Sequence, residues 1–221
     1  MDRTKWPGKA DLPIARPGIV YICIASLFTL LLFFIKWDFL AWVALFADFF
    51  ICWFFRDPDR NIPDNENALV SPADGKIIIS EKIGKNNYIE DSCIKISIFM
   101  NVFNVHVNRI PFSGIIEKTI YYPGKFFNAS FDKASKDNEK NALIIRTNSG
   151  KRYALVQIAG LIARRIISRV KQGDKIKCGE RYGMICFGSR LDIYVPEDTE
   201  IAVKIGEKVK AGSSILGYLK Q

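Results

Sequence analysis

Two almost uninterrupted apolar runs lie near the start of the chain. Gly18–Ile35 contains no charged residue, and Phe39–Phe55 contains one, Asp48. Each run is close to the roughly 20 residues that cross the apolar part of a bilayer as a helix. Because only residues 36–38 separate them, the pattern predicts a helical hairpin over about residues 18–55, which either spans the membrane or dips into one leaflet. Asp48 has no basic partner within this hairpin, so we expect it where the hairpin meets water or protein.

Basic residues flank the predicted hairpin on both sides. They are Arg3, Lys5, Lys9 and Arg16 before it and Arg56 and Arg60 after it, against Lys36 alone at its tip. Since cytoplasmic flanks of membrane helices are enriched in Lys and Arg, both ends are expected in the cytoplasm. The sequence therefore predicts a cell-membrane protein with an N-terminal membrane segment, residues 1–55, and a cytoplasmic domain, residues 56–221.

After Ala68 the pattern changes to short apolar or alternating runs that are separated by turn residues. This pattern is typical of strands and predicts a mainly β domain. The expected strands are 76–79, 94–99, 102–108, 115–121, 142–146, 153–158, 184–187, 191–195 and 202–205. Gly160–Val170 is the segment that admits a short helix, although its three arginines equally suit a strand edge or a membrane-facing loop.

An internal repeat refines the prediction of the β fold. Val170–Gly179 matches Val203–Gly212 at its valine, glycines and lysines. A glycine turn, an acidic residue, an alternating strand and a second glycine turn are what two equivalent hairpins of a small barrel require. We therefore expect a small pseudo-symmetric barrel or sandwich, similar to the barrel-sandwich hybrid of lipoyl and biotinyl carrier domains.

Composition narrows the class of partner. The formal charge of +9 favours an anionic partner, and the apolar segment makes bilayer headgroups a better expectation than nucleic acid. The five cysteines form no C-x-x-C pair, so neither a disulfide framework nor a metal site is predicted. The chain also has no Walker loop, dinucleotide-binding glycine motif, H-E-x-x-H or G-x-S-x-G elbow.

Three features carry candidate chemistry, although each by itself is more typical of ordinary structure. Asp74 lies in a turn between a proline and a glycine directly before an expected strand. His106 is the only histidine and falls on the polar side of an alternating run, so any imidazole base must be this residue. Gly188-Ser189 alone reads as a turn.

Four motifs behind the hydrophobic hairpin, taken together and in order, resemble the phosphatidylserine decarboxylase family in its short bacterial and archaeal form. The motifs are Phe55-Arg56-Asp57-Pro58, Ser71-Pro72-Ala73-Asp74-Gly75, Asn104-Val105-His106-Val107-Asn108-Arg109-Ile110-Pro111 and Phe187-Gly188-Ser189-Arg190. The resemblance extends from about Arg56 to the C-terminus. It implies a lyase that converts phosphatidylserine into phosphatidylethanolamine and carbon dioxide.

The resemblance also implies that the enzyme makes its own cofactor. The Ser189 hydroxyl attacks the Gly188 carbonyl to give an ester, and elimination and hydrolysis then convert Ser189 into an N-terminal pyruvoyl group. Cleavage leaves chains 1–188 and 189–221, which remain associated. By the logic of a serine triad, His106 is the base and Asp74 orients it. The pyruvoyl group forms a Schiff base with the substrate amine and replaces pyridoxal phosphate.

Two positions depart from the longer family members. Those members carry H-x-x-H where this chain has His106 and Arg109, so His106 serves both self-cleavage and decarboxylation or Arg109 takes over one step. A guanidinium is no base but binds carboxylate or phosphate, so Arg109 is expected to contact substrate or an oxyanion. Arg190 stands where the long form has threonine, and we expect it beside the pyruvoyl group, contacting an anionic headgroup or solvent.

Other functions remain open at this point. The lipid substrate is either phosphatidylserine or its ether-linked archaeal equivalent, archaetidylserine. A membrane-tethered barrel adaptor without catalysis and a conventional hydrolase that uses Ser189, His106 and Asp74 are the alternatives, and both predict one uncut chain. A homo-oligomer is compatible with the sequence.

Overall fold

A computed structural model describes residues 13–129, 137–161, 166–186 and 188–220. The chain divides into two compact units, residues 1–59 and residues 60–221. The basic residues Arg3, Lys5 and Lys9, on which the predicted orientation partly depends, lie outside the described residues.

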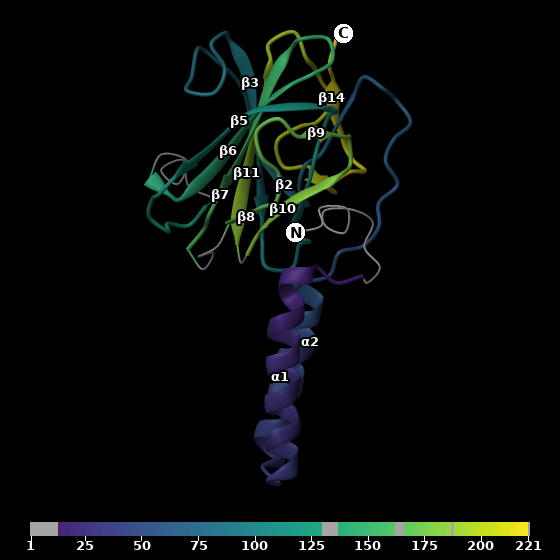
Figure 1. Cartoon of the computed structure of the whole chain (residues 1–221), viewed down its shortest axis with the longest axis vertical. Coiled ribbons are helices and arrows are strands. Elements are labelled where there is room, and N and C mark those ends of the chain that lie inside the picture. Colours follow the sequence, from purple (N-terminus) through teal and green to yellow (C-terminus); the bar gives the residue numbers. More distant parts are fainter. Residues whose placement is uncertain (1–12, 130–136, 162–165, 187, 221) are drawn as a thin grey trace. The chain divides into compact units, whose positions relative to one another are not determined.

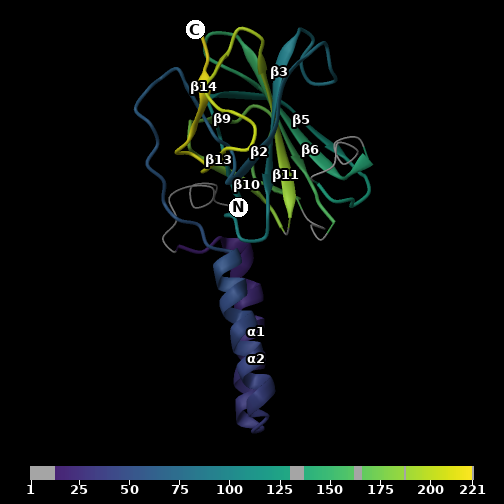
Figure 2. The same cartoon turned by 180° about the vertical axis from the view of Figure 1, so that it is seen from behind.

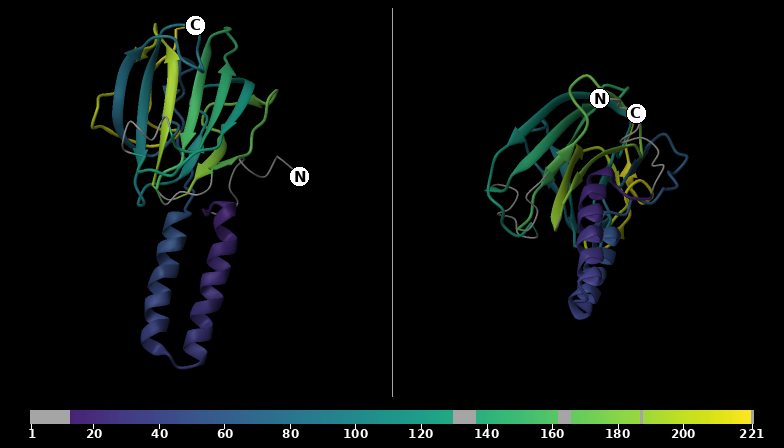
Figure 3. Two further views of the ribbon diagram at one scale, coloured as in Figure 1. Left: turned by 90° about the vertical axis from the view of Figure 1, so that its left-hand side faces the viewer. Right: turned by 60° about the horizontal axis from the view of Figure 1, so that its bottom comes forward.

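The first unit is the helical hairpin that the apolar runs predict. Helix α1 (Arg16–Phe34) and helix α2 (Asp38–Phe54) lie side by side and are joined by a tight turn at Lys36, whose φ is 59° (Figure 3). The open end is closed by backbone hydrogen bonds of 2.7 Å from Ala15 to Phe55 and from Asp57 to Pro13. Among the described residues, α1 is the helix that is long and apolar enough to cross a membrane.

Asp48, the acid within the second apolar run, has a partner on the other helix. Its carboxylate accepts a hydrogen bond of 2.6 Å from the Ser26 hydroxyl, and the side chain is 9% exposed. The acid therefore lies against protein, where a hydroxyl on the facing helix takes the place of a basic partner.

The second unit is built on one large antiparallel sheet that curls on itself (Figure 1). Its strand order is β13-β2-β3-β11-β7-β6-β5-β9. The strands are β2 (Gly75–Ile83), β3 (Cys93–Met100), β5 (Gly114–Tyr122), β6 (Lys140–Arg146), β7 (Arg152–Ile158), β9 (Lys175–Ile176), β11 (Ser189–Pro196) and β13 (Lys208–Val209). The mainly β architecture is as predicted.

Two three-stranded sheets complete the domain. One has the order β1-β14-β12 and is formed by β1 (Ala68–Val70), β14 (Ile215–Tyr218) and β12 (Glu200–Ile201). The other has the order β4-β10-β8 and is formed by β4 (Val107–Arg109), β10 (Arg181–Ile185) and β8 (Ile166–Ser168). Figures 1 and 2 both show β14 on the side of the domain away from β6.

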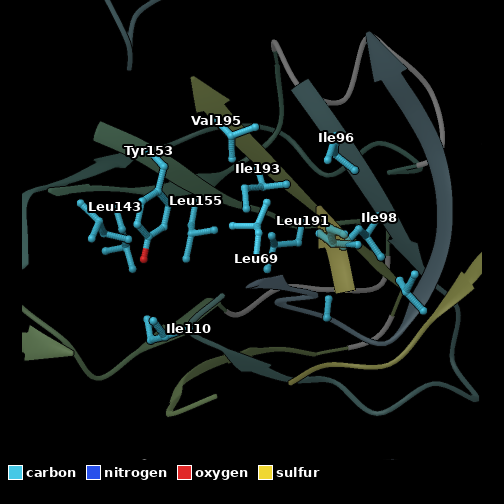
Figure 4. Close-up of a cluster of buried hydrophobic side chains, with 14 of the residues drawn as sticks. Leu69, Ile96, Ile98, Ile110, Leu143, Tyr153, Leu155, Leu191, Ile193 and Val195 are labelled. Atoms are coloured by element: carbon cyan, nitrogen blue, oxygen red, sulfur yellow. The ribbon is translucent and has the colours of Figure 1, made fainter. Parts of the chain in front are cut away.

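The core lies inside the curl of the large sheet. Alternate residues of β11, Leu191, Ile193 and Val195, point into it beside Leu155 and Ile96 of neighbouring strands (Figure 4). All five side chains are fully buried. Because strand side chains alternate between faces, the residues between them in β11 emerge on the opposite face of the sheet.

The repeat seen in the sequence corresponds to two equivalent pairings in the structure. β13 pairs with the start of β2, and β9 pairs with the start of β5. In each copy a left-handed glycine donates its N–H at 2.8 Å to the partner strand, Gly206 to Ile77 and Gly173 to Ile116. The two copies thus join different strands in the same way, which confirms the predicted pseudo-symmetry.

Three local predictions are wrong in part. Of the expected strand 102–108, residues 102–106 lie outside a strand, and residues 102–104 form a turn, because the Asn101 and Asn104 side chains accept backbone N–H groups and compete with strand pairing. Residues 202–205 lead into a turn, where Lys204 N–H is bonded to the Glu207 carboxylate. In Gly160–Val170, residues 166–168 are strand β8, paired with β10, and residues 162–165 lie outside the described residues.

Candidate functional site

Ser189 is the first residue of β11 and is fully buried. It pairs with Met100, the last residue of β3, and its hydroxyl lies 3.9 Å from the Met100 sulfur. A thioether is a weak acceptor, so this contact orients the hydroxyl without binding it strongly. The hydroxyl thus stays available to react with a neighbouring group.

Gly188, which precedes it, has the left-handed φ of +64°. Residues 186–188 connect the end of β10 to the start of β11. A non-glycine residue reaches this φ only with strain, whereas glycine reaches it freely. The Gly188–Ser189 bond therefore joins a residue in a conformation that favours glycine to the first residue of β11.

His106 directly precedes β4 and is fully buried. Its backbone carbonyl accepts from Ile185 N–H at 3.4 Å, which places it beside the end of β10, a few residues before Gly188. Its Nδ1 lies 2.9 Å from the Asn104 carbonyl oxygen. Because a carbonyl oxygen only accepts, Nδ1 carries a proton, and in the neutral form of the ring the lone pair is on Nε2. This tautomer is the one that a base acting through Nε2 requires.

Asp74 is held by an arginine that sequence reasoning did not place in the site. Both carboxylate oxygens accept from Arg60 Nη2, at 2.8 and 3.0 Å, and Oδ1 also accepts from Ala211 N–H at 2.8 Å. In a serine triad the orienting carboxylate binds Nδ1 of histidine, a position that the Asn104 carbonyl occupies beside His106. No local spacing relates Arg60 to Asp74, so the motif that ends at Pro58 gave no signal for this pair.

The register of the large sheet brings the start of β2 and the start of β11 to the same end of the strands, beside the last residues of β3. Lys76 and Arg190 both pair with Phe99 of β3, from opposite sides. Asp74, which lies just before β2, and Ser189 therefore flank the end of β3. Two of the predicted candidates, Asp74 and Ser189, thus lie at the same end of the strands although they are distant in sequence.

A chain of buried polar side chains leads away from Ser189 and was missing from the sequence prediction. The Met100 sulfur also faces Asn108 Nδ2 at 3.7 Å, Asn108 Oδ1 accepts from Gln157 at 2.9 Å, and Gln157 accepts from Asn141 at 3.3 Å. Each of these side chains is at most 5% exposed. Asn108 shares the polar side of the alternating run with His106, but nothing in the sequence pattern marked its partners.

Arg109 lies in β4 with a side chain that is 5% exposed. Its Nη1 donates to the Gly179 carbonyl at 3.0 Å, and its Cδ lies 2.9 Å from where a Cβ on Gly212 would be. These contacts join β4 to the second glycine turn of each copy of the repeat, at Gly179 and at Gly212. They give the guanidinium a structural role in the uncleaved chain.

Arg190 projects from the face of β11 opposite to Ser189 and is fully buried. Its guanidinium makes a two-pronged ion pair with Asp192, at 2.5 and 3.1 Å, and donates to Ser97 at 2.9 Å. Of the two alternatives for Arg190, a headgroup contact or solvent, solvent is wrong for the uncleaved chain, because the guanidinium is buried against Asp192 and Ser97.

Comparisons with known proteins agree with the motifs. The family model described as phosphatidylserine decarboxylase matches residues 46–217. A relative from Syntrophus aciditrophicus is 52% identical over 210 residues, 95% of this chain and 99% of the relative. One from Desulfotalea psychrophila is 49% identical over 209 residues, 95% and 98%, and one from Burkholderia vietnamiensis is 49% identical over 208 residues, 94% and 97%.

All three relatives carry the name phosphatidylserine decarboxylase proenzyme. The comparisons thus place the chain among decarboxylases. It belongs to the phosphatidylserine decarboxylase family, as the sequence motifs predicted.

Proposed function

We propose that this chain is the precursor of a membrane-anchored lyase that converts phosphatidylserine into phosphatidylethanolamine and carbon dioxide. The observation that carries the proposal is the family match over residues 46–217, which includes Asp74, His106 and the Gly188–Ser189 bond. The substrate is taken from the relatives' names, and the hairpin provides the anchor. A formal charge of +9 adds attraction to anionic lipid.

The proposed first reaction is self-cleavage before Ser189. The Ser189 oxygen bonds to the Gly188 carbonyl carbon, the C–N bond breaks, and the hydroxyl proton moves to the departing nitrogen. Removal of the Ser189 Cα proton then expels the Gly188 carboxylate and leaves dehydroalanine. Water hydrolyses its imine tautomer to a pyruvoyl group and ammonia. His106, with its lone pair on Nε2, is the proposed base for both proton transfers.

The strand pairings support a stable two-chain product. The fragment 189–221 would contribute β11, which pairs with β3 and β7, β13, which pairs with β2, and β14, which pairs with β1. All of these partners belong to the fragment 1–188. Both chains would therefore remain associated through hydrogen-bonded strands after the cut.

The buried start of β11 suits the prosthetic group, because Ser189 would become an N-terminus fixed by the Met100 pairing. When formed, the pyruvoyl group supplies an electron-accepting carbonyl for the substrate amine. We propose that His106 moves protons here and that the Arg60–Asp74 pair fixes the loop before β2. Arg109 and Arg190 already bind Gly179 and Asp192, and we assign them to holding the fold rather than the lipid.

Intact-mass spectrometry of the purified protein tests the proposal. We expect two species, residues 1–188 and residues 189–221, the latter with a carbonyl that borohydride reduces, and we expect one uncut species for Ser189→Ala. An uncut wild-type chain with an ordinary serine would support the adaptor or the hydrolase instead. Release of labelled carbon dioxide from vesicles of carboxyl-labelled phosphatidylserine, compared with its ether-linked analogue, tests the substrate.

A further inference from the structure

Gly160, in the connection that follows β7, lies against the carbonyl of the peptide bond that is proposed to break. A Cβ built on Gly160 would be 1.7 Å from the Gly188 carbonyl oxygen and 2.8 Å from its carbon. Real Cβ atoms are never this close to backbone atoms, so only glycine permits this arrangement. The contact joins two segments that the sequence gives no reason to associate.

The glycine is needed here for space and not for backbone conformation. Gly160 has no left-handed φ, whereas Gly188 has a φ of +64° with open space around its own Cβ position. An alanine at 160 is therefore compatible with the local backbone, and the atoms that it would meet first belong to Gly188. Its effect is thus directed at the Gly188 carbonyl.

A buried amide fixes the segments around Gly160. Asn138 Nδ2 donates at 2.7 Å to both the Ala159 and the Phe127 carbonyls, and its Oδ1 accepts from Phe127 N–H at 2.9 Å. Ala129, just beyond Phe127, lies 3.4 Å from the Cβ position of Gly160. Asn138 is 1% exposed, so these bonds are made away from water.

From these contacts we propose that Gly160, held by Asn138, packs against the Gly188 carbonyl oxygen and thereby orients the carbonyl group for attack by Ser189. This inference rests on the proposed self-cleavage. The Ser189 oxygen must bond to the carbonyl carbon, and a carbonyl that is already held in the orientation for attack lowers the barrier. Gly160 and Asn138 are positioning residues, because they act through the Gly188 carbonyl.

The test is the rate of self-cleavage of the full-length protein, followed by intact mass after cell-free synthesis in lipid vesicles. An alanine at 160 must push the carbonyl away, and a misplacement of about 1 Å costs a reaction roughly 100-fold, so Gly160→Ala should be slowed at least that much. Gly84→Ala is the matched control, because its Cβ meets nothing within 4 Å, and it should cleave at the wild-type rate.

Hydroxylamine separates positioning from a later defect. It cleaves esters, so it accelerates the cut when an ester accumulates. If Gly160 positions the carbonyl, Gly160→Ala stops before the ester and hydroxylamine has no effect. A hydroxylamine-dependent cut in this variant would overturn the inference.

Folding is tested in chains that cannot cut. Ser189→Ala and Ser189→Ala/Gly160→Ala should unfold at similar denaturant concentrations. If the double variant does not fold, the cleavage rate of Asn138→Ala tests the inference instead. Asn86→Ala is its control, because Asn86 also bonds the backbone through its side chain but lies in another loop. Asn138→Ala should slow cleavage about 10-fold, by the loss of precise positioning. Wild-type rates in Gly160→Ala, or in Asn138→Ala if it decides, would overturn the inference, whereas an uncut wild-type chain would overturn the proposed function itself.

Discussion

Asp74 and Ser113 occupy equivalent positions in the two halves of the β domain. Asp74 Oδ1 accepts from Ala211 N–H at 2.8 Å, and Ser113 Oγ accepts from Cys178 N–H at 2.9 Å. A left-handed glycine follows each donor. The repeat therefore builds the same turn twice, and in each case the turn donates an N–H to a side chain that precedes a strand. That side chain is a carboxylate only at Asp74, which lies at the end of the strands where β11 begins.

This equivalence provides a matched pair of substitutions. Asp74→Asn removes the charge that faces Arg60 and leaves a largely buried guanidinium without its partner, which we expect to cost about 3 kcal/mol of unfolding free energy. Ser113→Ala removes the equivalent neutral hydrogen bond and should cost about 1 kcal/mol. Denaturant unfolding of both variants in the Ser189→Ala background measures the difference. Equal costs would show that the Arg60–Asp74 pair adds nothing.

Cys178 lies in the turn that is bonded to Ser113, and its thiol makes stability depend on pH. Burial raises the pKa of its thiol from 9.0 to about 11. In the folded chain the thiol stays protonated up to about pH 11, whereas in the unfolded chain it ionises from about pH 9. The unfolded state therefore binds fewer protons between these values, and stability falls as the pH rises through this window.

The measurement compares wild type with Cys178→Ala between pH 8 and pH 11. The variant lacks this titration, so we expect its unfolding free energy to fall less steeply. Alkylation followed by peptide mapping is an independent check. Cys178 should react much more slowly in the folded protein than in urea at pH 9, and equal rates would contradict the raised pKa.

The sequence was a good guide to the large sheet and a poorer one to the short strands. Long runs such as Cys93–Met100 alternate clearly, because one face packs on the core. The error over 102–104 arose because Val102 and Phe103 read as strand residues, whereas the flanking Asn101 and Asn104 bond the backbone of a turn. Side-chain hydrogen bonds to the backbone of this kind leave no periodic pattern of apolar residues, so the sequence pattern does not reveal them.

The candidate site was predictable where a motif carried it and not where tertiary contacts build it. Ser189 and His106 became candidates because they fall within recognisable motifs. Arg60, Asn138 and Gly160 act through contacts with residues far away in sequence, and such contacts leave no spacing to detect. Arg190 was placed wrongly with respect to solvent because both faces of β11 are buried, so alternation in polarity did not indicate exposure.

The Ser26–Asp48 hydrogen bond should stabilise the hairpin. Asp48→Asn keeps an oxygen acceptor for the Ser26 hydroxyl, whereas Asp48→Leu removes it. Interhelical hydrogen bonds in membranes contribute roughly 0.6–2 kcal/mol, so we expect leucine to weaken association of separated α1 and α2 peptides about 3- to 30-fold. Energy transfer between labelled peptides in micelles measures this. Asparagine should remain near wild type, and equally strong association of the leucine peptide would argue against the contact.

The ion pair between Arg190 and Asp192 distinguishes a structural role from a lipid-binding role. Both side chains are fully buried, and Lys95 lies 3.6 Å from the same carboxylate. Asp192→Asn leaves two cations facing a neutral amide, and breaking a buried pair in this way costs about 3–5 kcal/mol. We expect that loss in denaturant unfolding.

Arg190→Met removes the other partner but leaves Asp192 its contact with Lys95, so its cost should be smaller. If Arg190 serves only the fold, any Arg190→Met or Arg190→Lys protein that folds and processes itself should keep the wild-type KM for phosphatidylserine vesicles. A raised KM with unchanged unfolding free energy would instead indicate that Arg190 binds the headgroup. That outcome would require the side chain to leave Asp192 after the cut, because in the uncleaved chain its Nε and Nη2 are both bonded to that carboxylate.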